Sequence, residues 1–253
     1  MSTYIQNFIK FQPLSRDIKI KYRRSVLGVL WTLLNPLCMM IVLSLVFSNI
    51  FKFRVENFPL YLLSGQIIFN FFSDATTSAM SAVINNAALI KKVYMPKYLF
   101  VISRVFSSFI NLLASFTALL VVMIATRAEL HWKVVFAVIP LGFIVVFSLG
   151  VGLLLSALVV KFRDIMHLYS VFITALLYLT PVIYPMSSLP YWMQKVVGLN
   201  PITNILMMFR DVMLYDNFPN LSSILIATIE SLAALGIGVY VFYKKQDEFI
   251  LNI

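Results

Sequence analysis

Long apolar stretches alternate with short polar ones along most of the chain. Six apolar stretches reach the ~20 residues that a helix needs to cross a bilayer. They lie at about 30–51, 58–80, 103–125, 133–157, 166–185 and 221–243. We therefore predict an all-α integral membrane protein with six transmembrane helices, in which residues 1–253 form a single membrane domain.

The N-terminal residues 1–29 alternate apolar and basic positions around Pro13. This pattern predicts an amphipathic helix that lies along the membrane interface, before the chain turns into the bilayer. A merely basic tail is the alternative.

Residues 186–220, between the fifth and sixth stretches, contain several signals for helix ends. Pro190 and Gly198 bound one short helix, and Asn200 followed by Pro201 begins a second one. Neither helix is long enough to cross a bilayer, so we predict two short re-entrant helices that cap one end of a pathway. An aromatic anchor at the membrane interface is the alternative.

The second apolar stretch carries a polar stripe. Its members are Gln66, Asn70, Ser73, Asp74, Thr77 and Ser81. Spacings of three and four place them on one face of a helix. Because such a face is costly against lipid, we expect it to line a hydrated cavity or to pack on a partner helix.

Three ionisable residues lie inside or at the ends of the predicted spans. Asp74 and Arg104 lie near the same end of neighbouring spans, and we expect an ion pair between them. Glu230 lies close to the middle of the sixth span. The cost of burying its carboxylate predicts contact with the polar stripe or a path to water.

Composition agrees with the membrane prediction, and the charges orient the spans. Hydrophobic residues make up 61% of the chain, far above the proportion in soluble domains. The 20 Lys and Arg residues outnumber 10 Asp and Glu, and fourteen of the basic residues lie in the terminal tails and in the loops after the second and fourth spans. By the positive-inside rule both termini are cytoplasmic. Nucleic-acid binding is the weaker explanation of this charge.

Chemical motifs are few. Cys38 is the only cysteine, so neither an intrachain disulfide nor a cysteine zinc cluster can form. His131 and His167 lie far apart, and we expect them at helix ends rather than on a metal. The chain contains no H-E-x-x-H, no G-x-S-x-G and no G-x-x-x-x-G-K-[ST] sequence. We therefore expect no catalytic site, metal or cofactor on this chain, and active transport would need a separate ATPase. A secondary transporter with paired halves is not indicated.

Five stretches in the expected order together resemble the type-2 ABC exporter permeases. They are KYRRSVLGVLWTLLNP (21–36), LIKKVYMPKYLFVISR (89–104), KFRDIMHL (161–168), LTPVIYP (179–185) and LNPITNILMMFRDVML (199–214). The resemblance is to the branch that exports lipid-linked polysaccharides such as O-antigen, capsule and teichoic acid. It implies a homodimer in the bacterial cytoplasmic (inner) membrane, two copies of an ABC nucleotide-binding subunit that binds ATP and Mg, and an undecaprenyl-linked polysaccharide as substrate.

The resemblance also implies roles for individual positions. The coupling helix and its exposed end, which contact the ATPase in such exporters, correspond to Leu89, Ile90, Lys91, Lys92, Val93, Tyr94, Met95, Pro96 and Lys97. Arg163 and Asp164 resemble the second cytoplasmic turn, which ties the fourth and fifth spans. The external gate helices are matched by Tyr191, Trp192, Asn200, Pro201, Phe209 and Arg210.

We further hypothesise that two copies enclose a channel lined by the first and fifth spans. Sugars stack on aromatic faces and hydrogen-bond to polar groups, so we expect both kinds of side chain in its wall. The candidates are Trp31, Gln66, Asn70, Tyr178, Thr180 and Tyr184. Two alternatives stay open, namely a type-2 ABC exporter of drugs or small lipids and an intramembrane enzyme of lipid or sugar metabolism.

Overall fold

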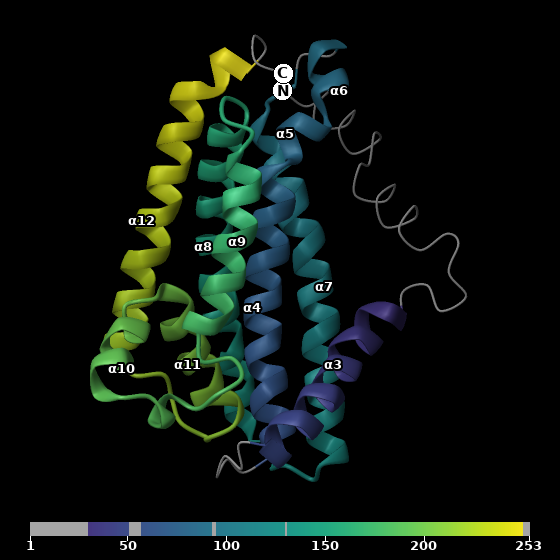
Figure 1. Ribbon diagram of the computed structural model, residues 1–253, viewed down its shortest axis with the longest axis vertical. Helices are drawn as coiled ribbons and strands as arrows, with labels where there is room; N and C mark the ends of the chain where they lie inside the picture. The colour runs from purple at the N-terminus through teal and green to yellow at the C-terminus, as the bar shows by residue number, and fades with distance from the viewer. Residues whose placement is uncertain (1–29, 51–56, 93–94, 130, 250–253) are drawn as a thin grey trace.

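The computed structural model describes residues 30–50, 57–92, 95–129 and 131–249, and these are mainly helical (Figure 1). No strand occurs among these residues. The amphipathic helix predicted over residues 1–29 lies outside them, as do Val93 and Tyr94 of the predicted coupling segment.

Long helices form at each predicted apolar stretch. They are α3 (Leu30–Ile50), α4 (Phe58–Met80), α7 (Tyr98–Ala125), α8 (Val138–Val159), α9 (Ile165–Leu179) and α12 (Leu221–Lys245). Three segments are long and apolar enough to cross a membrane, namely Tyr98–Ala125, Trp132–Val159 and Leu221–Glu248. The apolar helices Trp31–Phe47 and Ile165–Leu179 are shorter. Helix α4 has 23 residues, but the polar stripe lowers its apolar character. The count of six membrane crossings therefore stays a prediction.

Short helices occupy both ends of the bundle. They are α5 (Ala82–Asn85), α6 (Ala87–Lys92), η1 (Trp132–Ala137), η2 (Met186–Ser188), α10 (Tyr191–Gly198), α11 (Pro201–Met213) and η3 (Gln246–Glu248). Figure 1 shows α5 and α6 at one end, and α10 and α11 at the opposite end. The two helices predicted from the proline, glycine and asparagine signals are thus present, and the side chain of Asn200 caps α11 by accepting a hydrogen bond from the Ile202 amide at 3.0 Å. Their re-entrant position in a membrane stays a prediction.

The fifth helix is shorter than its apolar stretch predicts. Helix α9 ends at Leu179, and Thr180 is extended, with φ −110° and ψ 133°. Pro181 explains the early end, because a proline pushes the preceding residue out of helical geometry. Residues 180–185 instead form a turn beside the other helices, so the prediction of a span to residue 185 is wrong.

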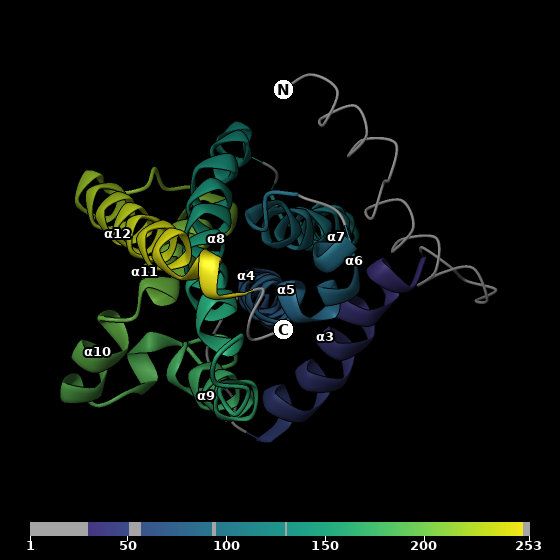
Figure 2. The same cartoon turned by 90° about the horizontal axis from the view of Figure 1, so that it is seen from above.

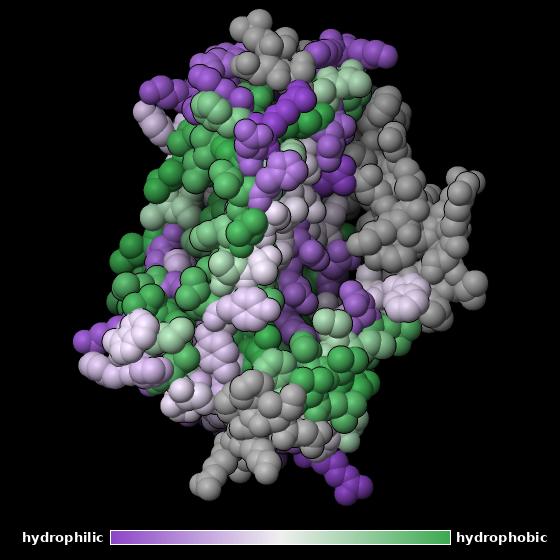
Figure 3. All heavy atoms as spheres, viewed as in Figure 1, coloured by the Kyte–Doolittle hydropathy of each residue, from purple (hydrophilic) through white to green (hydrophobic). Residues whose placement is uncertain are grey.

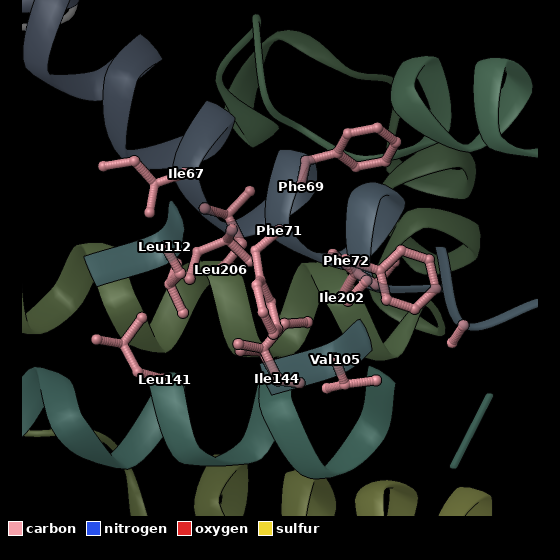
Figure 4. Close-up of a cluster of buried hydrophobic side chains, with 14 of the residues drawn as sticks. Ile67, Phe69, Phe71, Phe72, Val105, Leu112, Leu141, Ile144, Ile202 and Leu206 are labelled. Carbon is pink, nitrogen blue, oxygen red and sulfur yellow. The ribbon is translucent and has the colours of Figure 1, made fainter. Parts of the chain in front are cut away.

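Helix α4 lies at the centre of the bundle. Seen from above, α3, α7, α8 and α9 surround it (Figure 2). Its Phe71 and Phe72 are buried in the main core with Ile144 of α8 (Figure 4), and the Phe72 ring stacks on Phe147 with centroids 5.6 Å apart. These apolar side chains of α4 therefore form its core face.

Helices α8 and α12 approach each other through glycines. A Cβ atom on Gly238 would lie 2.1 Å from the carbonyl oxygen of Gly150, and one on Gly150 would lie 2.4 Å from backbone atoms of Ala234 and Leu235. Only glycine permits this backbone contact. The rest of α12 is largely exposed, as at Ile229, so this crossing fixes the helix to the bundle.

Candidate functional site

A polar cavity lies between α3, α4 and α7, and we call it the α3–α4–α7 cavity. Its volume is about 260 Å³. Its lining consists of Trp31, Thr32, Asn35, Pro36, Met39, Asn70, Asp74, Asn111 and Ser115. Figure 3 shows hydrophilic surface running along this side of the molecule between apolar areas. A polar hollow that opens on the surface of an apolar bundle is the first candidate for a ligand pathway.

Only part of the polar stripe of α4 lines the cavity, together with residues of α3. Asn70 and Asp74 line the cavity, whereas Gln66 is buried and its Oε1 has no hydrogen-bond partner among the described residues. Trp31 of α3, one of the channel candidates, is 49% exposed at the same cavity. The structure thus brings Trp31 and Asn70 together and places Gln66 inside the subunit.

Sequence reasoning missed Asn35 and Asn111, which complete the cavity from α3 and α7. Each is an isolated carboxamide in an apolar helix. This is the same kind of signal that singled out Glu230, because an intramembrane polar group needs a partner.

A second polar centre surrounds Arg210, whose side chain is completely buried. Its Nη1 donates to the carbonyl oxygen of Pro181 at 2.7 Å, and its Nη2 donates to those of Tyr61 at 3.0 Å and Val182 at 3.1 Å. Its Nε donates to the Ser64 hydroxyl at 3.2 Å. None of these acceptors is acidic. The guanidinium therefore fastens α11 to α4 and to the turn after α9, and we call this set of contacts the Arg210 clamp.

The clamp depends on a close approach to α4. The carbon of the guanidinium lies 3.5 Å from the centroid of the Tyr61 ring. A Cβ atom on Gly65 would lie 2.7 Å from Nη2 of Arg210, so glycine leaves room for the guanidinium. Burial lowers the pKa of Arg210 to about 10, and the side chain stays cationic at neutral pH.

Tyrosines extend the polar centre toward the surface. The Tyr61 hydroxyl donates to the carbonyl oxygen of Tyr184 at 3.0 Å, and the Tyr184 hydroxyl donates to that of Tyr178 at 2.7 Å. Tyr178 itself is 64% exposed on α9. Thr180 is fully buried, and its hydroxyl accepts from Nδ2 of Asn200 at 2.9 Å. Of these channel candidates Tyr178 is the open one, while Thr180 faces the interior.

The predicted gate residues separate into two groups. Tyr191 and Trp192 on α10 are exposed, and Pro201 begins α11. Phe209 is buried with Arg210, and its ring lies 6.2 Å from that of Phe116. Phe209 and Arg210 thus anchor α11, whereas α10 carries the exposed aromatic side chains.

The predicted coupling segment lies at the opposite end of the bundle. Lys91 and Lys92 are exposed at the end of α6, while Ile90 is buried in the core. Leu89 and Met95 are partly buried and pack against the same core. The apolar side chains of the segment therefore pack against the core, while its lysines are exposed.

Pro96 and Lys97 connect α6 to α7. Helix α6 spans Ala87–Lys92, so exposed Pro96 lies between the two helices and does not directly follow α6. The Lys97 ammonium donates to the carbonyl oxygen of Gln246 and lies 5.5 Å from the centroid of the Phe249 ring. The end of α12 thus contacts the start of α7.

The second predicted turn is exposed. Arg163 and Asp164 lie between α8 and α9. The carbonyl oxygen of Asp164 accepts hydrogen bonds from the amides of His167 and Leu168, both at 3.1 Å. Asp164 therefore begins α9 through its backbone.

Three ionisable residues were predicted to lie in or near the spans, namely Asp74, Arg104 and Glu230. An ion pair between Asp74 and Arg104 is not among those that the described residues form with one another, although neither side chain is without a partner. Glu230 lies near Asn204 of α11, and its Oε2 is buried without a hydrogen-bond partner among the described residues. Within the described ranges, no group of three His, Cys, Asp or Glu side chains is placed to hold a metal.

Comparison with known proteins gives a consistent result. Residues 12–214 match the family described as ABC-2 type transporter. The chain is 28% identical over 240 residues to the O-antigen export system permease protein RfbA of Myxococcus xanthus, covering 94% of this chain and 92% of the relative. It is 25% identical over 237 residues to RfbA of Klebsiella pneumoniae, covering 93% and 91%. Identity to the polysialic acid transport protein KpsM of Escherichia coli is 21% over 244 residues, covering 94% and 93%.

Proposed function

Because the chain belongs to the ABC-2 type transporter family, we propose that it is the permease subunit of an ATP-driven exporter that moves a lipid-linked polysaccharide across the cytoplasmic (inner) membrane. The observation that carries this proposal is similarity over more than nine tenths of the chain to permeases named for O-antigen and polysialic acid. The polar cavity between apolar helices supports it, because a hydrophilic polymer needs such a path.

The permease crosses the membrane six times, with both termini in the cytoplasm. Helices α3, α4, α7, α8, α9 and α12 supply the crossings. The end that carries α5, α6 and η3 then faces the cytoplasm, and α10 and α11 lie at the external mouth as gate helices. The Lys and Arg distribution supports this orientation.

Two copies of the chain enclose the channel. Helices α3 and α9 flank α4 on one side of the bundle (Figure 2), and both expose apolar side chains there, such as Leu45 and Val171. A second copy would cover these faces and close the polar path between them. The undecaprenyl-linked polymer would slide along weak contacts with Trp31, Asn70 and Tyr178.

Energy comes from two copies of a separate nucleotide-binding subunit, which holds ATP and Mg. The exposed lysines of α6 support its placement at this end, because they project from a helix that is seated on the core. Movement of the partner subunits would displace α6 and alternate the channel between closed and open states.

Charge reversal tests the coupling assignment. The variant Lys91→Glu/Lys92→Glu should copurify less ATPase, or hydrolyse ATP without exporting polymer. Lys195→Glu is the matched control, because Lys195 is exposed at the opposite end of the bundle. Normal copurification together with normal ATP turnover in the double variant would refute the assignment.

Deletion tests the substrate. Loss of this chain should cause a lipid-linked glycan to accumulate on the cytoplasmic side. Accumulation of a small lipid or a drug instead would favour the other exporter class. Chemical turnover by the purified chain in liposomes without any ATPase would favour an enzyme.

A further inference from the structure

Lys97 differs from the other lysines of the predicted coupling segment. Lys91 and Lys92 are exposed at the end of α6, whereas Lys97 is only partly exposed. Its ammonium donates a hydrogen bond to the carbonyl oxygen of Gln246, 149 residues later in the chain. The side chain of Lys97 is therefore held by the protein itself, although the resemblance groups it with residues that contact the ATPase.

The partner of Lys97 is the C-terminal end of α12. Gln246 is the C-cap residue of that helix. The last carbonyl groups of a helix have no acceptor role within it, and they carry the negative end of the helix dipole. A cation that bonds to them satisfies both needs. Lys97 thus caps α12, although it belongs to a different helix.

The position of Lys97 is unfavourable for its own helix. Lys97 is the N-cap residue of α7, and its side chain makes no capping hydrogen bond there. The N-terminal end of a helix carries the positive end of the dipole, where a cation is disfavoured. A lysine at this position therefore stabilises the end of α12 rather than the start of α7.

Phe249 completes the contact. Its amide donates to the same Gln246 carbonyl oxygen, and its ring centroid lies 5.5 Å from the Lys97 ammonium, within the ~6 Å reach of a cation–π interaction. Phe249 is buried, and its ring packs edge-on against Phe242 of α12 at 5.2 Å. The turn after α12 is thus fixed to α12 and holds Lys97. We call Lys97, Gln246 and Phe249 the α7–α12 joint.

Helix α12 leads from this joint to the opposite end of the bundle (Figure 1). Its 25 residues extend over about 37 Å at 1.5 Å per residue. On the way it crosses α8 at Gly238 and Gly150. Near its first turn the carbonyl oxygen of Ser223 accepts a hydrogen bond from Nδ2 of Asn204 in α11 at 3.2 Å. One helix therefore connects the coupling segment with α8 and α11.

We propose that Lys97 is a positioning residue that makes α12 follow the coupling segment, and that it is not a contact with the ATPase. Lys91 and Lys92 remain the ATPase contacts of the segment. Displacement of the segment by the partner subunit then moves α12 and the attached α8, in addition to α7, which follows Lys97 directly. This inference rests on the proposed function and changes the role that the resemblance implies for Lys97.

Two sets of lysine variants separate the two roles. Lys97→Met keeps a long apolar side chain but removes the ammonium. It should leave copurification with the ATPase unchanged and raise the ATP hydrolysed per polymer exported several-fold, because hydrolysis no longer moves α12 with the segment. Lys91→Met/Lys92→Met is the matched comparison, and it should reduce copurification. Lys97→Arg keeps a cationic donor and should restore most of the ratio.

A double variant tests whether Lys97 acts through Phe249. Phe249→Leu keeps an apolar side chain and removes the aromatic face, so it should also raise the ratio. Phe249→Tyr keeps the ring and should restore it. Lys97→Met/Phe249→Leu should be no worse than the stronger single variant, since both changes disrupt one contact.

Spin labels measure the joint independently of transport. Cys38→Ser removes the only native cysteine, and Ile102→Cys and Tyr243→Cys place labels at exposed positions of α7 and α12. In the complex with the ATPase, the distance between the labels should be the same with and without ATP. In the Lys97→Met background, ATP should shift or broaden this distance by several ångströms.

Two results would overturn the proposal. If Lys97→Met loses the ATPase as completely as Lys91→Met/Lys92→Met does, Lys97 is a partner contact. If Lys97→Met changes neither the ratio nor the distance between the labels, the joint does not link α12 to the segment. Failure of the unmodified chain to copurify with any ATPase would instead count against the proposed function. The width of the distance distribution in the chain alone would then still test the joint.

Discussion

Replacing Arg210 by methionine tests whether the clamp holds α11 in place. Methionine has a similar length and suits a buried site, but it donates no hydrogen bond. The carbonyl oxygens of Pro181 and Val182 accept only from Arg210 within the described residues. Both would therefore be left buried without a donor.

The magnitude follows from these two acceptors. A buried acceptor without a donor costs about 1–3 kcal/mol, so the pair costs about 2–6 kcal/mol. The Tyr61 carbonyl adds little, because it still accepts from the Ser64 hydroxyl at 2.7 Å. Removing a desolvated cation that has no acidic partner offsets part of the loss. We expect a net loss of about 2–4 kcal/mol in the free energy of unfolding.

Unfolding of the purified chain in mixed micelles, titrated with a denaturing detergent, measures this loss. Arg210→Lys should recover part of it, since an ammonium replaces a planar fork with a single point charge. Gly65→Ala perturbs the same contact without removing the charge, because its Cβ would lie 2.9 Å from the Val182 carbonyl oxygen. The control is Lys195→Met at an exposed cation, which should change stability by about 0.5 kcal/mol or less.

A neutral result would refute the reasoning. If both Arg210→Met and Gly65→Ala unfold within about 0.5 kcal/mol of the unmodified chain, the clamp does not stabilise α11. A loss in Arg210→Met alone would mean that the close approach at Gly65 is not required.

Two further predictions use the same unfolding experiment. Gly238→Ala should destabilise the chain by about 1–3 kcal/mol or more through overpacking, because the new Cβ would clash with the backbone of Gly150. Gly236→Ala is the control. It should be neutral or stabilise the chain by up to about 1 kcal/mol, because a Cβ atom there would have no atom within 4 Å. Equal effects of the two substitutions would refute the glycine crossing. Tyr169→Phe should cost about 1 kcal/mol, because it removes the 2.6 Å hydrogen bond to the Thr76 hydroxyl that joins α9 to α4. An unchanged stability would mean that water replaces this bond.

Helix positions were the most predictable part of the fold. Apolar length dictates them, and the ends of α4 and α12 agree with the expected ranges because polar residues and Asn220 mark them. The end of α9 was not predicted correctly, since hydropathy continues through residues 180–185 while Pro181 stops the helix. Hydropathy describes the preference of side chains for apolar surroundings, and it does not report backbone geometry.

For the site, the sequence predicted only which residues share one face of a helix. The polar stripe on α4 grouped Asn70 and Asp74, which both line the cavity. The helical period does not say which residues of a helix face a neighbouring helix covers. For this reason Gln66 was grouped with them, although it is buried. Arg210 was assigned to the gate helices from the resemblance, and its complete burial was not predicted. Its acceptors are backbone carbonyls far away in sequence, and no side-chain pattern reveals them.

Helix α4 connects the two polar centres. The clamp contacts Tyr61 and Ser64, and the cavity begins at Asn70. At 1.5 Å per residue, Ser64 and Asn70 are about 9 Å apart along the helix axis. An uninterrupted helix is stiff over that length, so the clamp keeps α11 and the α4 wall of the cavity at a fixed separation. The hydrogen-bond partners of Arg210 all lie on α4 or in the turn after α9, and none lies on α3 or α7. The cavity can therefore change width while the clamp stays intact, provided that α3 or α7 moves against α4.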